Sequence, residues 1–483
     1  MPLVGTAPPA LRGRRLTADL RPAALDDVER FIVSDRRRLL HELQFLVRIP
    51  SVSADPAHAG DVQHCAVALG DDLQRIGLVD VELMPTRTHP LVVGGWHGAE
   101  GRPTLLVYGH YDVQPAGPAS AWGHPPFGAT VVSDKLVGRG AADDKGQLFA
   151  HLAAIEALLR TRGSLPVNVV AVFDGAEELG EPSLATILSR QGPWQAADLA
   201  VVSDTRMVGR GRPALTIAMR GLIGLDVQAD RTGRPVHAGH LGGAIPDPLA
   251  ALAEMLAGLH DRTGRISVPG FYERVAGPEI RIRPGPAPRP GPEGAAMLEA
   301  ADGVEGLGEP GYDLVARTTT RPALTVTGLA GGAVGGDTQA TIGTQARASL
   351  DIRIVPEQEP GDVAEAVARR LRRLAPPGIR VTVRVRSAVP PVRVDPAHPA
   401  TAIAAAALID GFGARPVAIR SGGSSPAVAA LVQAGFPVVL MGFSLPDDRI
   451  HGPNERLDLP TFFRAIIASA SLMERLGRAG VSW

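Results

Sequence analysis

The 483-residue sequence is poor in cysteine, aromatic residues and long apolar runs, and each shortage excludes a class of protein. Its single cysteine, Cys65, cannot form a disulfide framework or a thiolate metal site within one chain. Aromatic residues make up only 4% of the chain, which leaves few platforms for stacking nucleic-acid bases. The formal net charge is −1, with basic and acidic residues interleaved, so we expect no nucleic-acid partner.

No stretch approaches the roughly 20 apolar residues that a membrane-spanning helix requires, so we expect no membrane partner either. The N-terminal sequence has no apolar segment of signal-peptide length, and a reducing cytoplasm is the simplest location for the chain. Hydrophobic residues make up 45% of the sequence and charged residues 20%, which is typical of a globular interior. The length predicts two or three domains.

Hydrophobic periodicity divides the chain into four segments. Residues 1–22 are rich in proline, glycine and arginine, and we expect a loose N-terminal arm. In residues 23–215 helical and strand patterns alternate, which predicts a catalytic α/β domain with a mostly parallel sheet flanked by helices. Residues 216–390 alternate more strictly and predict an inserted α+β domain with an antiparallel sheet. Residues 391–483 return to the first pattern and complete the catalytic domain.

Acids and histidines follow several of the apolar runs, at points where predicted strands end. In open α/β sheets, ligands bind beyond the carboxyl ends of the strands. Taken singly, a strand-end aspartate caps a turn more often than it binds a ligand, and a lone histidine is more often structural. Together, the strand ends and loops bring one set of such residues to the same edge: His110, Asp112, Asp143, Asp144, Asp174, Glu177, Glu178, Asp204 and His451.

Several carboxylates at one sheet edge repel one another unless a cation neutralises them. Two imidazoles with three or more carboxylates and no sulfur suit zinc, cobalt or manganese, and the set is large enough for two divalent ions. A carboxylate such as Asp143 could bridge two metals about 3.5–4 Å apart. The His-x-Asp spacing lets His110 ligate while Asp112 holds its other ring nitrogen.

The chain resembles the dinuclear zinc metallopeptidases that include carnosinase-type dipeptidases, acetylornithine deacetylase and succinyl-diaminopimelate desuccinylase. The resemblance runs from about residue 30 to the C-terminus. Three stretches, "EPGYD", "RPALTVTGL" and "DIRIVP", look like the dipeptidase branch. The other stretches that carry the resemblance are, in order, "YGHYDVQP", "PPFGATVVSDKLVGRGAADDKG", "AEELG", "VVSDT", "VHAGHLGG", "RSGGSSP" and "HGPNE".

The resemblance implies a ligand set for two zinc ions, with manganese or cobalt as alternatives. One ion would be held by His110 and Asp204, and the other by Glu178 and His451. Asp143 would bridge the two ions. Members of the family often have a cis peptide bond after this aspartate.

The resemblance also implies roles for residues around the metals. Asp112 would orient His110, and Glu177 would be the general base for a metal-activated bridging water. The inserted domain would serve as a lid and as the interface of a homodimer. Through that interface, His237 would reach the active site of the partner subunit.

Three residues are candidates for binding a substrate carboxylate, because guanidinium groups pair bidentately with carboxylates. They are Arg353 in "DIRIVP" and the pair Arg420 and Ser424 in "RSGGSSP", although either arginine could equally be a surface charge. Two nearby stretches differ from the dipeptidase pattern: "HAG" at 237–239, where "HSG" is common, and "ATIG" at 340–343.

We therefore expect hydrolysis of a peptide bond in dipeptides or similar small substrates that carry a free carboxylate. A deacylase or amidohydrolase of N-acyl amino acids is the alternative within the same family. A catalytically silent binding protein is the third hypothesis. Catalytically silent members usually lack the general base or a metal ligand, and this chain has Glu177 and all five implied ligands.

Overall fold

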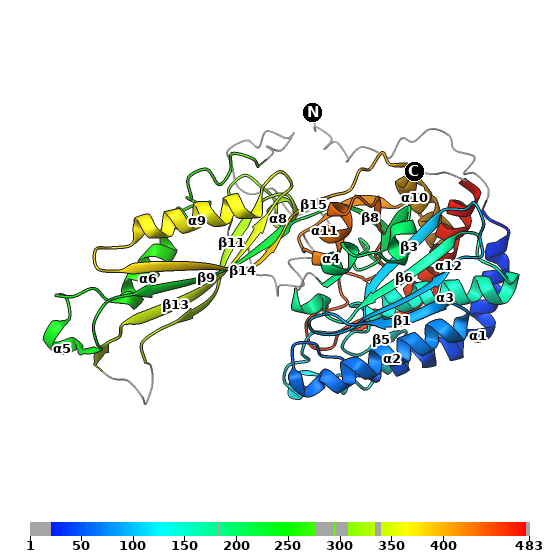
Figure 1. Cartoon of the computed structure of the whole chain (residues 1–483), viewed down its shortest axis with the longest axis horizontal. Coiled ribbons are helices and arrows are strands. Elements are labelled where there is room, and N and C mark those ends of the chain that lie inside the picture. Colours follow the sequence, from blue (N-terminus) through cyan, green and yellow to red (C-terminus); the bar gives the residue numbers. More distant parts are fainter. Residues whose placement is uncertain (1–20, 181–182, 276–293, 295–307, 334–339, 480–483) are drawn as a thin grey trace. The chain divides into compact units, whose positions relative to one another are not determined.

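The structure is a computed structural model that describes residues 21–180, 183–275, 294, 308–333 and 340–479 (Figure 1). Nearly all of the expected N-terminal arm therefore lies outside the described residues. The described chain forms two compact units. Unit 1 comprises the described residues within 21–217, 394–419 and 426–479, and unit 2 comprises those within 218–393 and 420–425. The expected domain limits, after residues 215 and 390, lie near these boundaries, whereas residues 420–425 were expected in the catalytic domain.

Unit 1 is built on a six-stranded sheet of order β1-β2-β6-β3-β7-β17. Its neighbouring strands β6, β3, β7 and β17 are parallel, while β2 runs antiparallel to both β1 and β6. Every residue of β3 is buried, as expected for a strand covered on both faces. The strands are β1 (Val79–Met84), β2 (Leu91–Trp96), β3 (Thr104–His110), β6 (Asn168–Asp174), β7 (Leu199–Val202) and β17 (Val438–Leu440). The predicted mostly parallel sheet is confirmed.

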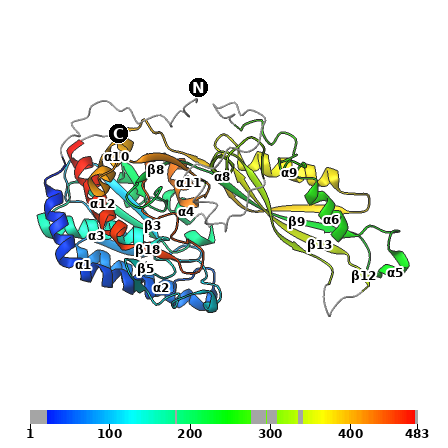
Figure 2. The same ribbon diagram turned by 180° about the vertical axis from the view of Figure 1, so that it is seen from behind.

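Helix α3 is buried over most of its length and contacts β3 and the helices α1, α2 and α12. Helix α10 lies beside α12 in both views (Figures 1 and 2). The helices are α1 (Ala24–Arg48), α2 (Ala59–Ile76), α3 (Lys145–Arg162), α4 (Ser183–Leu188), α10 (Pro399–Phe412), α11 (Pro426–Gln433) and α12 (Leu459–Ala479). Across the described parts of the chain, no helix is both long and apolar enough to cross a membrane.

A small antiparallel sheet of unit 1, of order β18-β5-β4, supports two loops that matter below. Its strands are β4 (Thr130–Val132), β5 (Lys135–Val137) and β18 (Arg456–Asp458). Strand β5 leads into the loop before α3, and β18 follows the loop that comes after β17. The pairing of β5 with β18 therefore brings together two loops that are about 300 residues apart in sequence.

Unit 2 contains an antiparallel four-stranded sheet of order β11-β13-β9-β14. Buried and more exposed residues alternate along β13, and α6 and α9 pack on the buried face. This is the predicted α+β architecture with an antiparallel sheet. The elements are β9 (Gly221–Asp230), β11 (Ala323–Ala330), β13 (Gln345–Ile354), β14 (Arg380–Val389), α6 (Pro248–Ala257) and α9 (Pro360–Leu374).

Shorter elements complete the described chain. Strands β10 (Val236–His237) and β12 (Thr341–Ile342) form a two-stranded ladder in unit 2. Helix α5 (Ala238–Leu241) directly follows β10, and α8 (Leu314–Thr319) precedes β11. A further three-stranded sheet consists of β15 (Val392–Arg393), β8 (Ala214–Met219) and β16 (Val417–Ser421).

Candidate metal centre

The parallel strands of unit 1 deliver polar residues to one edge of the main sheet. His110 is the last residue of β3 and is paired in register with Asp174, the last residue of β6. Asp204 follows the end of β7 by two residues. Glu177 and Glu178 lie in a short 3-10 helix (Glu177–Leu179) just after β6. Because parallel strands end at the same edge, these side chains come from neighbouring points of the fold.

Two loops supply the remaining members of the site. Asp143 lies in the loop between β5 and α3, and His451 lies in the loop between β17 and β18. The peptide bond between Asp143 and Asp144 is cis. Asp144 is not one of the metal-binding candidates, and its carboxylate accepts a hydrogen bond from the His110 backbone N–H (3.3 Å).

Five of the predicted ligands form two groups that share Asp143. Within each group, potential ligand atoms lie within 4.8 Å of one another, and the groups are His110, Asp143 and Asp204, and Asp143, Glu178 and His451. Asp143 Oδ1 lies 3.2 Å from Nε2 of His110, and Asp143 Oδ2 lies 2.9 Å from Nε2 of His451. His451 Nε2 is also 3.2 Å from Glu178 Oε1. The two oxygens of one carboxylate thus face two different histidines.

This donor set fits two divalent ions. Atoms that bind one tetrahedral zinc at about 2.0–2.2 Å lie roughly 3.3–3.6 Å apart, close to the separations between Asp143 and the two histidines. Oε1 of Glu178 is buried and lies 3.2 Å from Nε2 of His451, so both atoms could bind the same ion. Nitrogen and oxygen donors without sulfur suit zinc, manganese or cobalt.

The electrostatics of the site indicate a surplus of negative charge. Burial raises the pKa of both Glu177 and Asp204, and neighbouring carboxylates raise it further. Burial lowers the pKa of the His110 imidazole, but its contacts with Asp112 and Asp143 outweigh burial and raise it well above the usual value. Contacts with two acids raise the pKa of His451 to about 10. Divalent cations would relieve this repulsion.

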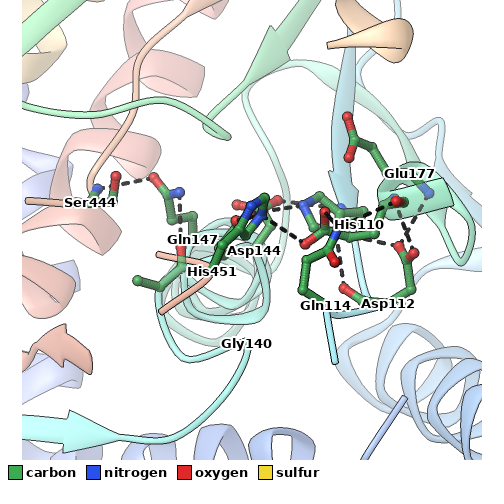
Figure 3. Close-up of polar contacts among 12 residues, drawn as sticks. His110, Asp112, Gln114, Gly140, Asp144, Gln147, Glu177, Ser444 and His451 are labelled. Atoms are coloured by element: carbon green, nitrogen blue, oxygen red, sulfur yellow. Dashed lines mark hydrogen bonds and ion pairs between the residues drawn. The ribbon is translucent and has the colours of Figure 1, made fainter. Parts of the chain in front are cut away.

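Asp112 is fully buried and connects the histidine to the two glutamates. Its carboxylate lies 3.4 Å from Nδ1 of His110 and accepts hydrogen bonds from the backbone N–H groups of Glu177 (3.2 Å) and Glu178 (3.1 Å). It also accepts a hydrogen bond from Ser53 Oγ (2.6 Å). Figure 3 shows Asp112 bonded to this backbone, while the carboxylate of Glu177 points away from it.

Comparison with known proteins decides the family, because residues 106–475, most of the chain, match the description "Peptidase family M20/M25/M40". The chain belongs to this family. The mostly parallel main sheet and the separate antiparallel sheet match the fold of solved structures that are similar to this chain. The resemblance seen in the sequence is therefore confirmed.

Individual M20 relatives are similar to this chain over nearly its whole length. The cysteinylglycine-S-conjugate dipeptidase of Corynebacterium striatum is 29% identical over 452 residues, covering 92% of this chain and 97% of that protein. The Cys-Gly metallodipeptidase DUG1 of Candida albicans is 28% identical, covering 92% and 95%. The crystal structure of human carnosine dipeptidase 1 superposes with a TM-score of 0.80 at 24% identity, covering 95% and 99%.

The other predicted site residues of this M20 protein lie in unit 2. Arg353 on β13 donates from Nη1 to Ser424 Oγ (3.2 Å) and pairs with Asp351. Arg420 is exposed and lies in the same 420–425 segment as Ser424. His237 is exposed on β10, and its ring centroid lies 4.7 Å from that of His240.

The two stretches that depart from the dipeptidase pattern lie side by side in unit 2. Strand β10, which ends at His237, pairs with β12, and His237 lies opposite Thr341 in this ladder. The backbone N–H of Ala238 donates to the carbonyl of Ala340 (2.6 Å). The "HAG" and "ATIG" stretches are therefore one local feature rather than two separate changes.

Some residues around the metal centre were not predicted individually. Gln114 Nε2 donates to Glu178 Oε2 (2.9 Å), and Ser53 holds Asp112 as described above. Glu455 accepts hydrogen bonds from the loop that carries Asp143. Gln114 and Glu455 both lie within stretches quoted for the resemblance, so their positions in those motifs were the available signal.

Proposed function

We propose that this chain is a metal-dependent dipeptidase that hydrolyses the peptide bond of small substrates with a free carboxylate. The observation that carries the proposal is the shared carboxylate of Asp143, whose two oxygens face His110 and His451 (3.2 and 2.9 Å). The relatives named above are dipeptidases, which supports the same class of substrate.

Five residues would hold two ions. His110 and Asp204 would bind one, Glu178 and His451 the other, and Asp143 would lie between them. When bound, the ions would polarise the scissile carbonyl and lower the pKa of water, which supplies a nucleophile near neutral pH. Zinc, manganese and cobalt all suit this donor set.

A side chain of the protein would accept and donate the proton that is transferred in the reaction. Glu177 accepts a proton from the attacking water as the water oxygen bonds to the carbonyl carbon. It then returns that proton to the amine nitrogen as the carbon–nitrogen bond breaks. Asp112 holds the backbone N–H of Glu177 (3.2 Å), so the base is fixed relative to the neighbouring histidine. Burial raises the pKa of the Glu177 carboxylate, which makes it a stronger base once ionised.

We expect an arginine side chain to bind the free carboxylate of the substrate. Arg353 is the principal candidate, because its side chain is 28% exposed and its Nη1 contacts Ser424 Oγ (3.2 Å). Asp351 neutralises part of its charge but leaves donors of the guanidinium available. Arg420 would add a second positive charge beside Ser424.

A substrate panel tests the proposal. Zinc- and manganese-loaded protein would be assayed on Cys-Gly, β-Ala-His, N-acetyl and N-succinyl amino acids, and a dipeptide amide. We expect kcat/KM for the better dipeptide to exceed that of the N-acyl substrates and the amide by at least about 100-fold, because only the dipeptides offer both an amine and a carboxylate. Faster turnover of N-acyl amino acids would instead indicate a deacylase. Stoichiometric metal without any hydrolysis would indicate a silent binding protein.

We further propose that the enzyme is a homodimer in which His237 completes the site of the partner subunit. His237→Ala should then lower kcat by about 10²–10³-fold, as loss of one donor to a developing oxyanion does. Metal content should stay at the wild-type level, because His237 is not among the proposed ligands. Steady-state kinetics with elemental analysis would measure both, and His240→Ala is the matched control on the neighbouring helix.

Mixed dimers separate this role from a role within one subunit. A dimer of one Glu177→Gln subunit and one His237→Ala subunit contains one site with both wild-type groups if His237 acts across subunits. Random exchange between the two variants should then restore about one quarter of the wild-type activity. No recovery after exchange, or a fully active monomer in sedimentation, would contradict the proposal.

A further inference from the structure

Glu455 is a completely buried carboxylate that is not a candidate metal ligand. Its Oε1 accepts hydrogen bonds from the backbone N–H groups of Ala142 (3.0 Å) and Asp143 (3.1 Å). Its Oε2 accepts hydrogen bonds from the backbone N–H of Gly140 (3.0 Å) and from Nη1 of Arg139 (2.6 Å). Each oxygen therefore accepts two hydrogen bonds, and all four donors belong to the loop between β5 and α3 that carries Asp143.

The same short segment also carries His451. His451 precedes Glu455 by four residues, and both lie between β17 and β18. The backbone has positive φ at Arg449 (57°), His451 (62°) and Asn454 (59°), a conformation that is uncommon for non-glycine residues, although asparagine and histidine adopt it more often than most. Asn454 is held as well, because its Oδ1 accepts from the backbone N–H of Gly123 (2.6 Å).

A purely structural ion pair does not account for this arrangement. Burying a charged pair gives little net stability, because desolvation offsets the attraction between the charges. Arg139 makes only one of the four hydrogen bonds to Glu455, and the other three donors are backbone amides. Groups that orient metal ligands from outside the metal's own shell are a recurrent feature of metal sites.

We propose that Glu455 is a positioning residue for the metal centre and that it sets the distance between Asp143 and His451. One end of the 451–455 segment places an imidazole 2.9 Å from Asp143 Oδ2, and the other end binds the backbone N–H of Asp143. The two contacts fix one candidate ligand relative to the other. This proposal rests on the metal-binding part of the proposed function.

Glu455→Gln is the sharpest test, because it keeps the shape of the side chain. A carboxamide has one acceptor oxygen, so its NH₂ group would face two N–H donors that now bind Oε1 or Oε2. We expect zinc affinity, measured by competition with a chromophoric chelator, to fall about 10–100-fold. Excess zinc should restore occupancy and most of kcat, with little change in KM.

Glu474→Gln is the matched control. Glu474 is also a buried glutamate paired with arginine in unit 1, but it lies on α12 and pairs with Arg162 at the far end of α3. This change should lower thermal stability without changing zinc affinity. If Glu455→Gln loses stability to the same extent but binds zinc within about twofold of the wild type, the positioning role is wrong.

Hydrogen exchange on the wild-type protein provides a measurement that does not depend on a folded variant. If Glu455 holds the loop, the backbone amides of Gly140, Ala142 and Asp143 should exchange slowly in the metal-free enzyme, and zinc should change their rates little. Rapid exchange without metal would overturn the proposal. Failure of the proposed function would look different, because zinc affinity would still depend on Glu455 while the panel showed no dipeptide hydrolysis.

Discussion

The Glu177→Gln variant should bind its metals normally and lose about 10²–10⁴-fold in kcat, the range that general base catalysis contributes. Glutamine has the size of glutamate but cannot accept a proton at neutral pH. The backbone N–H of Glu177 would still donate to Asp112 (3.2 Å), so the local structure should be preserved. Steady-state kinetics on the best dipeptide, with metal content measured by elemental analysis, would show both effects.

Glu178→Gln is the matched control, because the two glutamates are adjacent and chemically identical. Glu178 Oε1 lies 3.2 Å from His451 Nε2 and belongs to the second ligand group, whereas Glu177 belongs to neither group. The control should therefore lose metal as well as rate. If Glu177→Gln retained kcat within about tenfold of the wild type, Glu177 would not be the general base.

The main sheet could be predicted because its signal is local. Buried parallel strands form short apolar runs, such as "TLLVYG" in β3 and "NVVAVF" in β6. Strand ends can also be read along the chain, so the sequence indicated a set of acids and histidines at one edge, whereas the five candidate ligands among them were named from the family resemblance. Which oxygen of Asp143 faces which histidine depends on two loops joined through β5 and β18, and no local pattern records that pairing.

Unit 2 shows where the local signal fails. Residues 214–230 have the alternating pattern of a single half-exposed strand, but they form β8 and β9 with Arg220 between them. An added Cβ at Gly221 would lie 2.5 Å from the carbonyl oxygen of Val389 on β14, so β9 begins where two backbones approach closely. Strand β14 was not predicted at all. Its arginine-rich alternation, "RVTVRVRSAV", reflects an edge strand with one exposed face.

In unit 1, the burial and contacts of Glu455 could not be predicted from the sequence. The sequence placed it in the "HGPNE" stretch, but a glutamate in a polar loop is ordinarily a solvated charge. Its burial follows from contacts with residues 139–143, more than 300 positions earlier in the chain. Such a residue becomes visible only when the fold brings the two loops together.

The second large effect concerns substitutions of His110 and Asp112. These residues are two positions apart, but we expect their alanine variants to lose different properties. His110→Ala removes a candidate ligand whose Nε2 lies 3.2 Å from Asp143 Oδ1, so one metal equivalent should be lost and turnover should fall to background. Asp112→Ala leaves every candidate ligand in place. It should mainly lower kcat, because it removes the carboxylate beside His110 Nδ1 (3.4 Å) and the acceptor of the Glu177 backbone N–H, while the Asp112 carbonyl oxygen stays 3.0 Å from Nδ1.

Chelation provides the reference for both variants. Dialysis against a chelator should abolish dipeptide hydrolysis by the wild type, and zinc or manganese should restore it. Full activity after metal removal would contradict the whole assignment. The two variants should then differ in their response to added zinc, with Asp112→Ala filling both sites and His110→Ala filling one.

The expected difference between Asp112→Ala and His110→Ala assumes that Asp112 orients neighbouring groups and does not bind a metal. Ser53→Ala tests this assumption directly. Ser53 Oγ donates one of the hydrogen bonds to the Asp112 carboxylate (2.6 Å). Removing this hydroxyl is a much smaller change than removing a candidate metal ligand. Its loss should lower kcat modestly, by less than about tenfold, with metal affinity unchanged. Equal metal loss in Asp112→Ala and His110→Ala would instead mean that Asp112 is needed to assemble the metal site itself. Asp112 contacts His110 Nδ1 through its backbone carbonyl (3.0 Å) and its carboxylate (3.4 Å), on the side of the ring opposite Asp143, which supports an orienting role.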